Sequence, residues 1–135
     1  MIVKKISFPA FSGQTLEYSL TPIELKDYID FDVKRVYYLN QIVNNAKTGA
    51  HAHYKEKELF VVLQGEVILQ VHDEQGLRDI KMTMNDGVVI SSMVWHHFKD
   101  IKQGTVILAL SSTNYSPNRD DYIEDYQRYL QILDD

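Results

Sequence analysis

The stretch "GAHAHYKEKELFVVLQGE", residues 49–66, decides the fold class because it joins two histidines to an apolar run and a turn. The run "ELFVVL" (Glu58–Leu63) is followed by Gln-Gly and then by a second apolar run, "EVILQVH" (Glu66–His72). Two β-rich runs separated by Gln-Gly predict a tight hairpin. The stretch therefore indicates paired strands preceded by two closely spaced histidines.

Strand-like runs of the same kind lie on both sides of this stretch. They are "RVYYL" (Arg35–Leu39), "DIKMTM" (Asp79–Met84), "VVISSMVWHHF" (Val88–Phe98) and "TVILALSS" (Thr105–Ser112). Short strands spaced by roughly eight to twelve residues are typical of an all-β sandwich or barrel.

The C-terminal end has a different periodicity. In "RDDYIEDYQRYLQIL" (Arg119–Leu133) the apolar side chains recur at helical spacing, which predicts an amphipathic helix packed on the barrel. Asn118 or Asp120 is the expected N-cap of this helix. We therefore expect residues 1–135 to form one all-β domain with a C-terminal α-helix.

Composition narrows the class of function. Apolar residues make up 44% of the 135 residues and the net charge is −5, without a basic stripe, so nucleic acid is not an expected partner. The chain has no cysteine, which excludes disulfides, thiolate nucleophiles and Cys-based zinc sites. With neither a signal-peptide core at the N-terminus nor a membrane-length apolar stretch, we expect a soluble, cytoplasmic protein and no membrane contact.

Four histidines fall in two clusters, His51 with His53 and His96 with His97. In an extended strand, His51 and His53 point to the same face, whereas only one of the adjacent pair His96 and His97 can face the interior. Glu58 lies an odd number of residues after His53, so a turn through residues 54–57 is needed to return its side chain to the same interior.

These residue types allow three interpretations. Imidazoles and a carboxylate from His51, His53, Glu58 and His96 suit a divalent transition metal with open coordination positions. Without a metal, the same imidazoles titrate near neutral pH and can transfer protons. The third interpretation is that they are hydrogen-bonded wall residues of the barrel.

The pattern H-x-H, four residues, Glu, six residues, Gly resembles the first motif of the cupins, which are small β-barrels of the RmlC-like jelly-roll type. The second motif is represented by Gly87 and a late histidine in "GVVISSMVWHHF", with Met93 where many cupins have proline. The resemblance implies a cupin barrel, with His96 or His97 as the last polar residue of the interior.

A narrower resemblance covers most of the chain. It is carried by "FDVKRVYYL" (Phe31–Leu39), "GAHAH" (Gly49–His53), "MVWHHF" (Met93–Phe98) and "DDYIEDYQRYL" (Asp120–Leu130), in this order. Together they resemble the sugar-nucleotide 3,4-ketoisomerases, small cupins that act on dTDP-4-keto-6-deoxyglucose in deoxysugar biosynthesis.

This resemblance implies a homodimeric isomerase that needs no cofactor or metal. A base removes the C3 proton of the 4-keto sugar, an enediol forms, and a proton returns at C4, so that the ketone moves to C3. An aminotransferase and an acetyltransferase could then process the product toward O-antigen, S-layer or capsule glycans. The alternatives are a metal-dependent cupin enzyme using His51, His53, Glu58 and His96, and a non-catalytic sugar-nucleotide-binding cupin.

The resemblance also assigns residues. His51 is the expected base, His53 its partner, and Tyr38 an active-site hydroxyl that faces the sugar, while Tyr37 points the other way. Arg35, on the Tyr37 face of the strand, resembles a contact to the diphosphate. The expected substrate-binding residues are Arg35, His96, Glu58 and Tyr37.

Three positions depart from the pattern of that family. Gly13, in "SGQTL" (Ser12–Leu16), stands where the family has a large side chain, and Thr48 stands where it has arginine. Both changes remove possible substrate contacts and leave the configuration of the product at C4 open. Glu58 replaces the usual glutamine and restores a carboxylate that could bind metal.

Overall fold

The computed structural model describes residues 1–11 and 17–135, so Gly13 lies outside the described residues. The described elements, in chain order, are β1 (Val3–Ser7), the 3₁₀ turn η1 (Leu25–Asp27), β2 (Arg35–Leu39), β3 (Ala52–His53), β4 (Glu58–Gln64), β5 (Glu66–Asp73), β6 (Gly76–Thr83), β7 (Asp86–Ile90), β8 (Trp95–Lys99), β9 (Val106–Ser111), β10 (Tyr122–Ile123) and α1 (Tyr126–Asp134).

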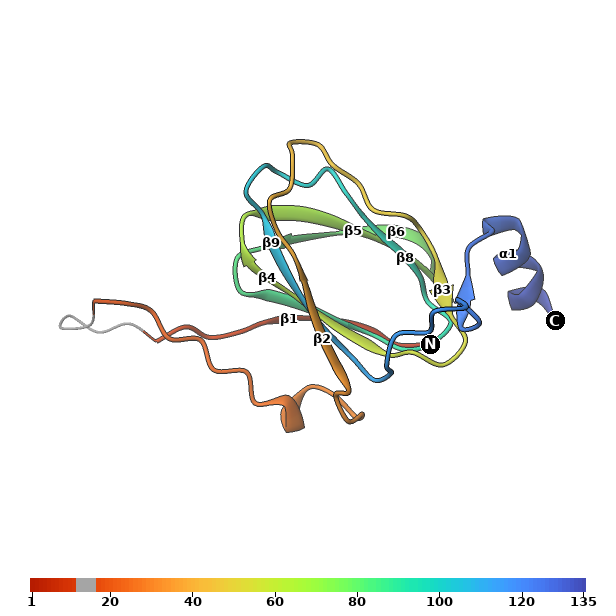
Figure 1. Cartoon of the computed structure of the whole chain (residues 1–135), viewed down its shortest axis with the longest axis horizontal. Helices are drawn as coiled ribbons and strands as arrows, with labels where there is room; N and C mark the ends of the chain where they lie inside the picture. Colours follow the sequence, from red (N-terminus) through yellow and green to blue (C-terminus); the bar gives the residue numbers. More distant parts are fainter. Residues whose placement is uncertain (12–16) are drawn as a thin grey trace.

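The strands form two antiparallel sheets that face each other as a jelly-roll barrel (Figure 1). One sheet has the order β1-β7-β4-β9-β2 and the other β6-β5-β8, while β3 pairs with β10 at the end of the barrel that carries α1. The all-β barrel with a C-terminal helix predicted from the sequence is therefore confirmed. Among the described helices, none is long and apolar enough to cross a membrane.

The sequence prediction of a hairpin at Gln64–Gly65 is wrong, because β4 and β5 belong to different sheets. The chain crosses from one sheet to the other at Gly65, which has a φ of +93°. A Cβ at this position would lie 2.2 Å from Thr105 Oγ1, so a side chain does not fit. The crossing is held by the Thr105 hydroxyl, which accepts a hydrogen bond from the Glu66 amide at 3.1 Å.

Strand β4 is buried on both faces because a layer covers each side of its sheet. Phe60 and Val62 pack in the core between the two sheets, whereas Leu59 and Val61 pack outward. The outward side chains pack beside Ile6 of β1, in the same sheet, and are covered by the segment around η1, which includes Tyr28. This second layer explains why the stretch "LFVV", residues 59–62, is continuously apolar instead of alternating.

The C-terminal helix starts later than its periodicity predicts. Tyr122 and Ile123 pair with β3 as a short strand, and α1 begins at Tyr126. Its N-cap is Asp125, whose carboxylate accepts hydrogen bonds from two amides of the first turn, so the predicted caps at Asn118 and Asp120 are wrong. The extended segment before α1 brings the chain back across the open end of the barrel.

Candidate active site

Three histidines gather at the end of the barrel where β3 and β8 meet. His51 and His96 form an isolated backbone bridge, and the His51 ring centroid lies 4.7 Å from those of His53 and His96. The rings of His53 and His96 are 5.9 Å apart. The structure thus brings the predicted catalytic pair and the predicted third histidine into one cluster.

Only one histidine of the adjacent pair on β8 faces the interior, as predicted. His96 is buried and belongs to the cluster. His97 pairs in register with Gln70 of β5 and points away from the cavity. Alternation along β8 therefore selects His96 as the interior side chain.

Glu58 lies behind the histidines and is 1% exposed. Its Oε1 atom is 3.6 Å from Nε2 of both His53 and His96, so the predicted change of phase across residues 54–57 is confirmed. The Tyr37 hydroxyl donates a hydrogen bond to Oε2 of Glu58. This carboxyl lies behind the imidazoles as seen from the cavity, because Glu58 is not among the described residues that line it.

The expected orientation of the tyrosines on β2 is wrong. Tyr38 is 63% exposed on the outer face, while Tyr37 faces the cavity together with Arg35. The two side chains do alternate, but pairing of β2 with β9 places Tyr37 beside Ala109, whose side chain also faces inward. Tyr37 is therefore the hydroxyl that β2 offers to a ligand.

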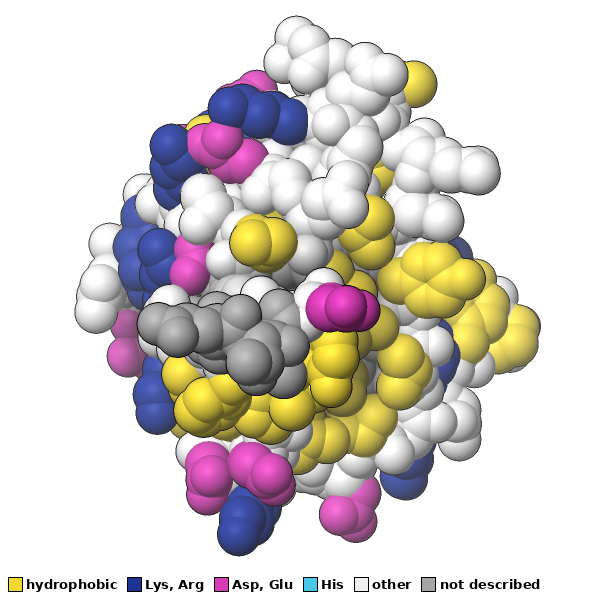
Figure 2. Space-filling model, turned by 90° about the vertical axis from the view of Figure 1, so that its left-hand side faces the viewer, with side chains coloured by type: hydrophobic (Ala, Val, Ile, Leu, Met, Phe, Trp, Pro, Cys, Tyr) yellow, Lys and Arg dark blue, Asp and Glu magenta, His cyan; other side chains and the backbone are white. Residues whose placement is uncertain are grey.

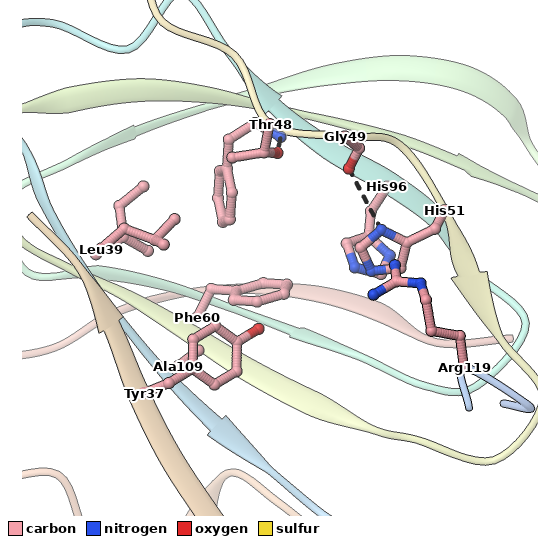
Figure 3. A pocket seen from close by; sticks show the side chains of 11 residues that line it. Tyr37, Leu39, Thr48, Gly49, His51, Phe60, His96, Ala109 and Arg119 are labelled. Atoms are coloured by element: carbon pink, nitrogen blue, oxygen red, sulfur yellow. Dashed lines mark hydrogen bonds between the residues drawn. The ribbon is translucent and has the colours of Figure 1, made fainter. Parts of the chain in front are cut away.

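The cavity has two lobes that share Tyr37 and His51. The first, of about 250 Å³, reaches into the barrel and has an apolar lining that includes Phe60, Phe98 and Ile107. In Figure 3 the Tyr37 hydroxyl points toward the histidines on the facing wall. The second lobe, of about 500 Å³, is more open, and its lining residues are Arg35, Tyr37, His51, His53, Glu56, Tyr115 and Tyr122.

The imidazoles are held neutral. Burial, followed by the nearby His96, lowers the pKa of His51 to about 4, and burial with the two other histidines lowers the pKa of His53 to about 2. Nδ1 of His51 lies 3.3 Å from the Gly49 carbonyl, and Nδ1 of His96 lies 2.9 Å from the Val94 carbonyl. A carbonyl only accepts, so Nδ1 carries the proton and Nε2 the free lone pair in both rings.

A second polar group lines the open lobe. Arg35 donates to Glu56 Oε1 at 3.1 Å, and the Thr113 hydroxyl donates to the same oxygen at 2.9 Å. Burial and the neighbouring Glu58 raise the pKa of Glu56 to about 7. Arg35 therefore lies in the cavity wall and forms an ion pair with Glu56.

Several residues of the site were not predicted from the sequence. Arg119 lines the inner lobe, and its guanidinium carbon lies 4.0 Å from the ring centroid of Tyr122, whose ring in turn packs 4.4 Å from His53. Glu56 and Asp121 complete the surroundings of His53. The motif "DDYI" (residues 120–123) carries part of the family resemblance. Its local sequence does not reveal that Tyr122 lines the cavity.

Thr48 lines the inner lobe with a small neutral side chain. Its hydroxyl accepts the backbone N–H of Phe98 at 2.9 Å. This side chain thus ties the segment before the histidine pair to β8, and the positive charge expected from the family pattern is absent at this position. The corresponding effect of Gly13 falls outside the described part of the chain.

Two groups of side chains have spacings that suit a metal ion, and both include His53. They are His51 with His53 and His96, and His53 with Glu56 and Asp121, the ligand atoms of each group lying within 4.8 Å of one another. Three imidazoles form a set that divalent transition metals accept. Glu58, expected as a ligand from the sequence, belongs to neither group, and its carboxyl accepts a hydrogen bond from Tyr37.

An antiparallel jelly-roll barrel with a histidine-lined cavity at one end defines this protein as a cupin. The FdtA family, described as "WxcM-like, C-terminal", matches residues 1–134, and the chain belongs to this family. It is also 30% identical over 116 residues to the TDP-4-oxo-6-deoxy-α-D-glucose-3,4-oxoisomerase of Aneurinibacillus thermoaerophilus. That match covers 85% of this chain and 82% of the relative.

Solved structures agree with the family assignment. A 3,4-ketoisomerase from Helicobacter canadensis superposes with a TM-score of 0.87 at 27% identity, over 100% of this chain and 99% of that one. A mutant of the 3,4-ketoisomerase QdtA from Thermoanaerobacterium thermosaccharolyticum, in complex with TDP-4-keto-6-deoxyglucose, gives 0.83 at 30% identity. The second match covers 96% of this chain and 92% of the other.

Proposed function

We propose that this chain, acting as one domain, is a sugar-nucleotide 3,4-ketoisomerase that converts dTDP-4-keto-6-deoxyglucose to a dTDP-3-keto-6-deoxyhexose. The observation that carries the proposal is the pair of neutral imidazoles, His51 and His53, facing the Tyr37 hydroxyl across one cavity. The activities named for the relatives at 27–30% identity support the same reaction.

The reaction needs a base, a proton donor and a polar cradle for an enediolate. The C4 carbonyl acidifies the C3 proton, which Nε2 of His51 accepts, and the electron pair of the C3–H bond forms the C3–C4 double bond. O4 takes up a proton as the enediol forms. The hydroxyl proton at O3 is then released, the C3 ketone forms, and C4 receives a proton. Each positioned acid–base group typically contributes ~10²–10⁴-fold.

The remaining side chains have supporting roles in this proposal. Tyr37 takes the place first expected for Tyr38, and its single hydroxyl proton turns from Glu58 to a sugar oxygen when the substrate enters. Arg35, at the open lobe, offers its guanidinium to the diphosphate. His96 forms the third wall of the sugar site, and Glu58 acts through the imidazoles.

Solvent isotope incorporation tests the reaction. We expect that dTDP-4-keto-6-deoxyglucose incubated with the protein in D₂O yields a 3-keto sugar carrying deuterium at C4, detected by NMR. His51→Asn is the inactive variant, since it keeps a polar side chain at this position and removes the base. Binding without product would instead favour a non-catalytic sugar-nucleotide-binding cupin.

A metal-dependent cupin enzyme is the second candidate, because the spacing of His51, His53 and His96 suits an ion. Metal analysis of protein purified without chelator separates the two candidates. The proposal of a cofactor-free isomerase predicts full activity after dialysis against EDTA. Near-stoichiometric transition metal, with activity lost on chelation, would favour the metal enzyme.

The place of this reaction in the cell follows from its product. A ketone at C3 is the substrate that an aminotransferase needs, and acetylation of the new amine would yield an acetamido sugar for O-antigen, S-layer or capsule glycans. A cytoplasmic site of action belongs to the same proposal, since sugar nucleotides are made from nucleoside triphosphates.

We also propose that the chain is a homodimer, because two apolar surfaces lack a partner within the described residues. β2 is an edge strand, and its outward side chains Val36 and Tyr38 are 58% and 63% exposed. The chain on either side of the bridge between Phe11 and Leu20 extends beyond the barrel (Figure 1), and hydrophobic side chains gather on this side of the molecule (Figure 2). Such surfaces on a small protein are typical of a subunit interface.

Light scattering after size-exclusion chromatography tests the dimer. We expect a mass of twice 15.7 kDa for the natural chain and a shift toward the monomer for the double variant Val36→Asp, Tyr38→Asp. Leu77→Asp is the control, since Leu77 is also exposed but lies on β6, in the other sheet. A monomeric natural chain would contradict the proposal.

A further inference from the structure

One ring nitrogen of His53 has no hydrogen-bond partner among the described residues, although the side chain is 3% exposed. That atom is Nδ1, and Oδ2 of Asp121 lies 3.6 Å from it. On the other side of the ring, Nε2 lies 3.6 Å from both Glu56 and Glu58. A buried polar atom without a partner is costly, so this nitrogen calls for an explanation.

Asp121 is held in place by the backbone that follows His53. Its Oδ1 accepts the Lys55 amide at 2.8 Å, and its Oδ2 accepts the Glu56 amide at 3.0 Å. In the opposite direction, the Tyr54 amide donates to the Asp121 carbonyl at 3.0 Å. The carboxylate therefore has a fixed position beside the imidazole, 3.6 Å from Nδ1.

We propose that Asp121 is a positioning residue that accepts a hydrogen bond from His53 Nδ1–H and so fixes the tautomer in which Nε2 carries the lone pair. A carboxylate is an acceptor only, whereas neutral imidazole carries one proton. The hydrogen bond made by one ring nitrogen decides which nitrogen is protonated. Hydrogen bonds of this kind are often long before substrate binds and tighten in the complex.

This assignment gives all three imidazoles of the site the same tautomer. Carbonyl oxygens hold the Nδ1 proton of His51 and His96, and the Asp121 carboxylate does so for His53. All three rings then present Nε2 as a proton acceptor. The segment before α1, which carries Asp121, thus affects proton transfer by fixing the tautomer of His53.

Nitrogen NMR of protein labelled with ¹⁵N-histidine tests the tautomer without substrate, and the His53 signals are identified by their loss in His53→Gln. We expect Nδ1 of His53 to be the protonated nitrogen in the natural chain. In Asp121→Ala no carboxylate faces Nδ1, so the protonated nitrogen should become Nε2, which lies 3.6 Å from the carboxyl oxygens of Glu56 and Glu58. A natural chain with Nε2–H, or an unchanged pattern in Asp121→Ala, would overturn the proposal.

Two control variants separate tautomer control from loosening of the turn. Ser112→Ala removes the hydrogen bond, 2.8 Å long, that the Lys57 amide donates to Ser112 Oγ, and so loosens the same turn without touching His53. Asp120→Asn changes the neighbouring exposed carboxylate. Both should keep the natural tautomer, and a tautomer change in Ser112→Ala would show that the turn, and not the carboxylate, is responsible.

The kinetic consequence rests on the proposed isomerase activity. We expect Asp121→Ala to lower kcat by tenfold or more with KM within about twofold, as expected when the imidazole that assists the base is held in the wrong tautomer. Equal losses in Ser112→Ala and Asp121→Ala would overturn the positioning role. If the natural chain shows no isomerase activity, the NMR result still decides the contact between Asp121 and His53.

Discussion

Tyr37 and Tyr38 provide a matched pair of neighbouring phenols on opposite faces of one strand. The Tyr37 hydroxyl donates to the buried Glu58, so Tyr37→Phe leaves a carboxyl oxygen without its donor. We expect kcat to fall by tenfold or more and the free energy of unfolding to drop by about 1–3 kcal/mol. Tyr38→Phe should leave both quantities unchanged, and steady-state kinetics with urea unfolding of the two variants checks the difference. A larger kinetic loss in Tyr38→Phe would contradict the assignment.

The depressed histidine pKa values predict an unusual pH profile. The base form of an imidazole exists above its pKa, and burial lowers the pKa of His51 from an ordinary 6.5 to about 4. The acid limb of kcat/KM should therefore lie near pH 4 instead of near 6.5. Initial rates between pH 4 and 8, with stability checked at each pH, measure it. An acid limb at 6.5 would mean that the base is not buried as described.

His51 and Glu56 make the free energy of unfolding depend on pH in opposite directions. Unfolded chains protonate His51 below pH 6.5 while the folded protein does not until about pH 4, so this residue lowers stability as the pH falls across that interval. Glu56 has a folded pKa of about 7 against an ordinary 4.5. Its contribution is fully present below pH 4.5 and is lost as the pH rises through 7. The two effects partly cancel between pH 4.5 and 6.5.

Residue types and spacing predicted which groups meet, but not every orientation. The odd spacing of Glu58 from His53 would place it on the opposite face of a straight strand, so its return to the interior was expected only with a turn through residues 54–57. Which of Tyr37 and Tyr38 faces inward could not be predicted from spacing, because both are phenols and neighbours in the chain. Only the pairing of β2 with β9 decides it. A buried carboxyl that accepts from a phenol also occupies the same volume as glutamine, so the replacement at Glu58 changes the site less than its charge suggests.

At the scale of elements, the crossing between β4 and β5 depends on a glycine. Gly65 and Gly76 have similar backbone angles, with φ of +93° and +90°, so an alanine is strained at both positions. Only at Gly65 would the added Cβ meet another atom, since Thr105 lies 2.2 Å away and Gly76 faces open space. We expect Gly76→Ala to cost about 1 kcal/mol and Gly65→Ala clearly more, by urea unfolding. Equal costs would contradict the close approach at Thr105.

Local patterns identified the strands but not their partners. Gln64–Gly65 is compatible with a hairpin and with a crossing between sheets, since both require a tight turn, and only the packing against Thr105 separates them. The start of α1 was missed for a related reason. Tyr122 and Ile123 fit the helical periodicity, but their pairing with His53 and Ala52 is a contact distant in sequence.

The cavity is assembled from both halves of the chain. Arg35 and Tyr37 come from β2, the histidines come from β3 and β8, and the wall beside His53 comes from the segment that leads into α1. The barrel alone therefore does not complete the site. Docking of the C-terminal helix should therefore limit the motion of Tyr122 in the cavity wall.

Tyr129 is the residue through which α1 docks, and it tests this dependence. Its ring is fully buried against Trp95, and its hydroxyl lies 2.8 Å from the Met93 carbonyl and 2.9 Å from the His72 carbonyl. Tyr129→Ala should lower the free energy of unfolding by about 3–5 kcal/mol, as for a large buried aromatic. It should also raise KM and speed amide hydrogen exchange in residues 119–135, although Tyr129 does not line the cavity. The control is Arg128→Ala, on the exposed face of the same helix, which should change neither. If Tyr129→Ala loosened α1 with unchanged KM, the segment before the helix would hold the wall of the cavity by its pairing with β3 alone.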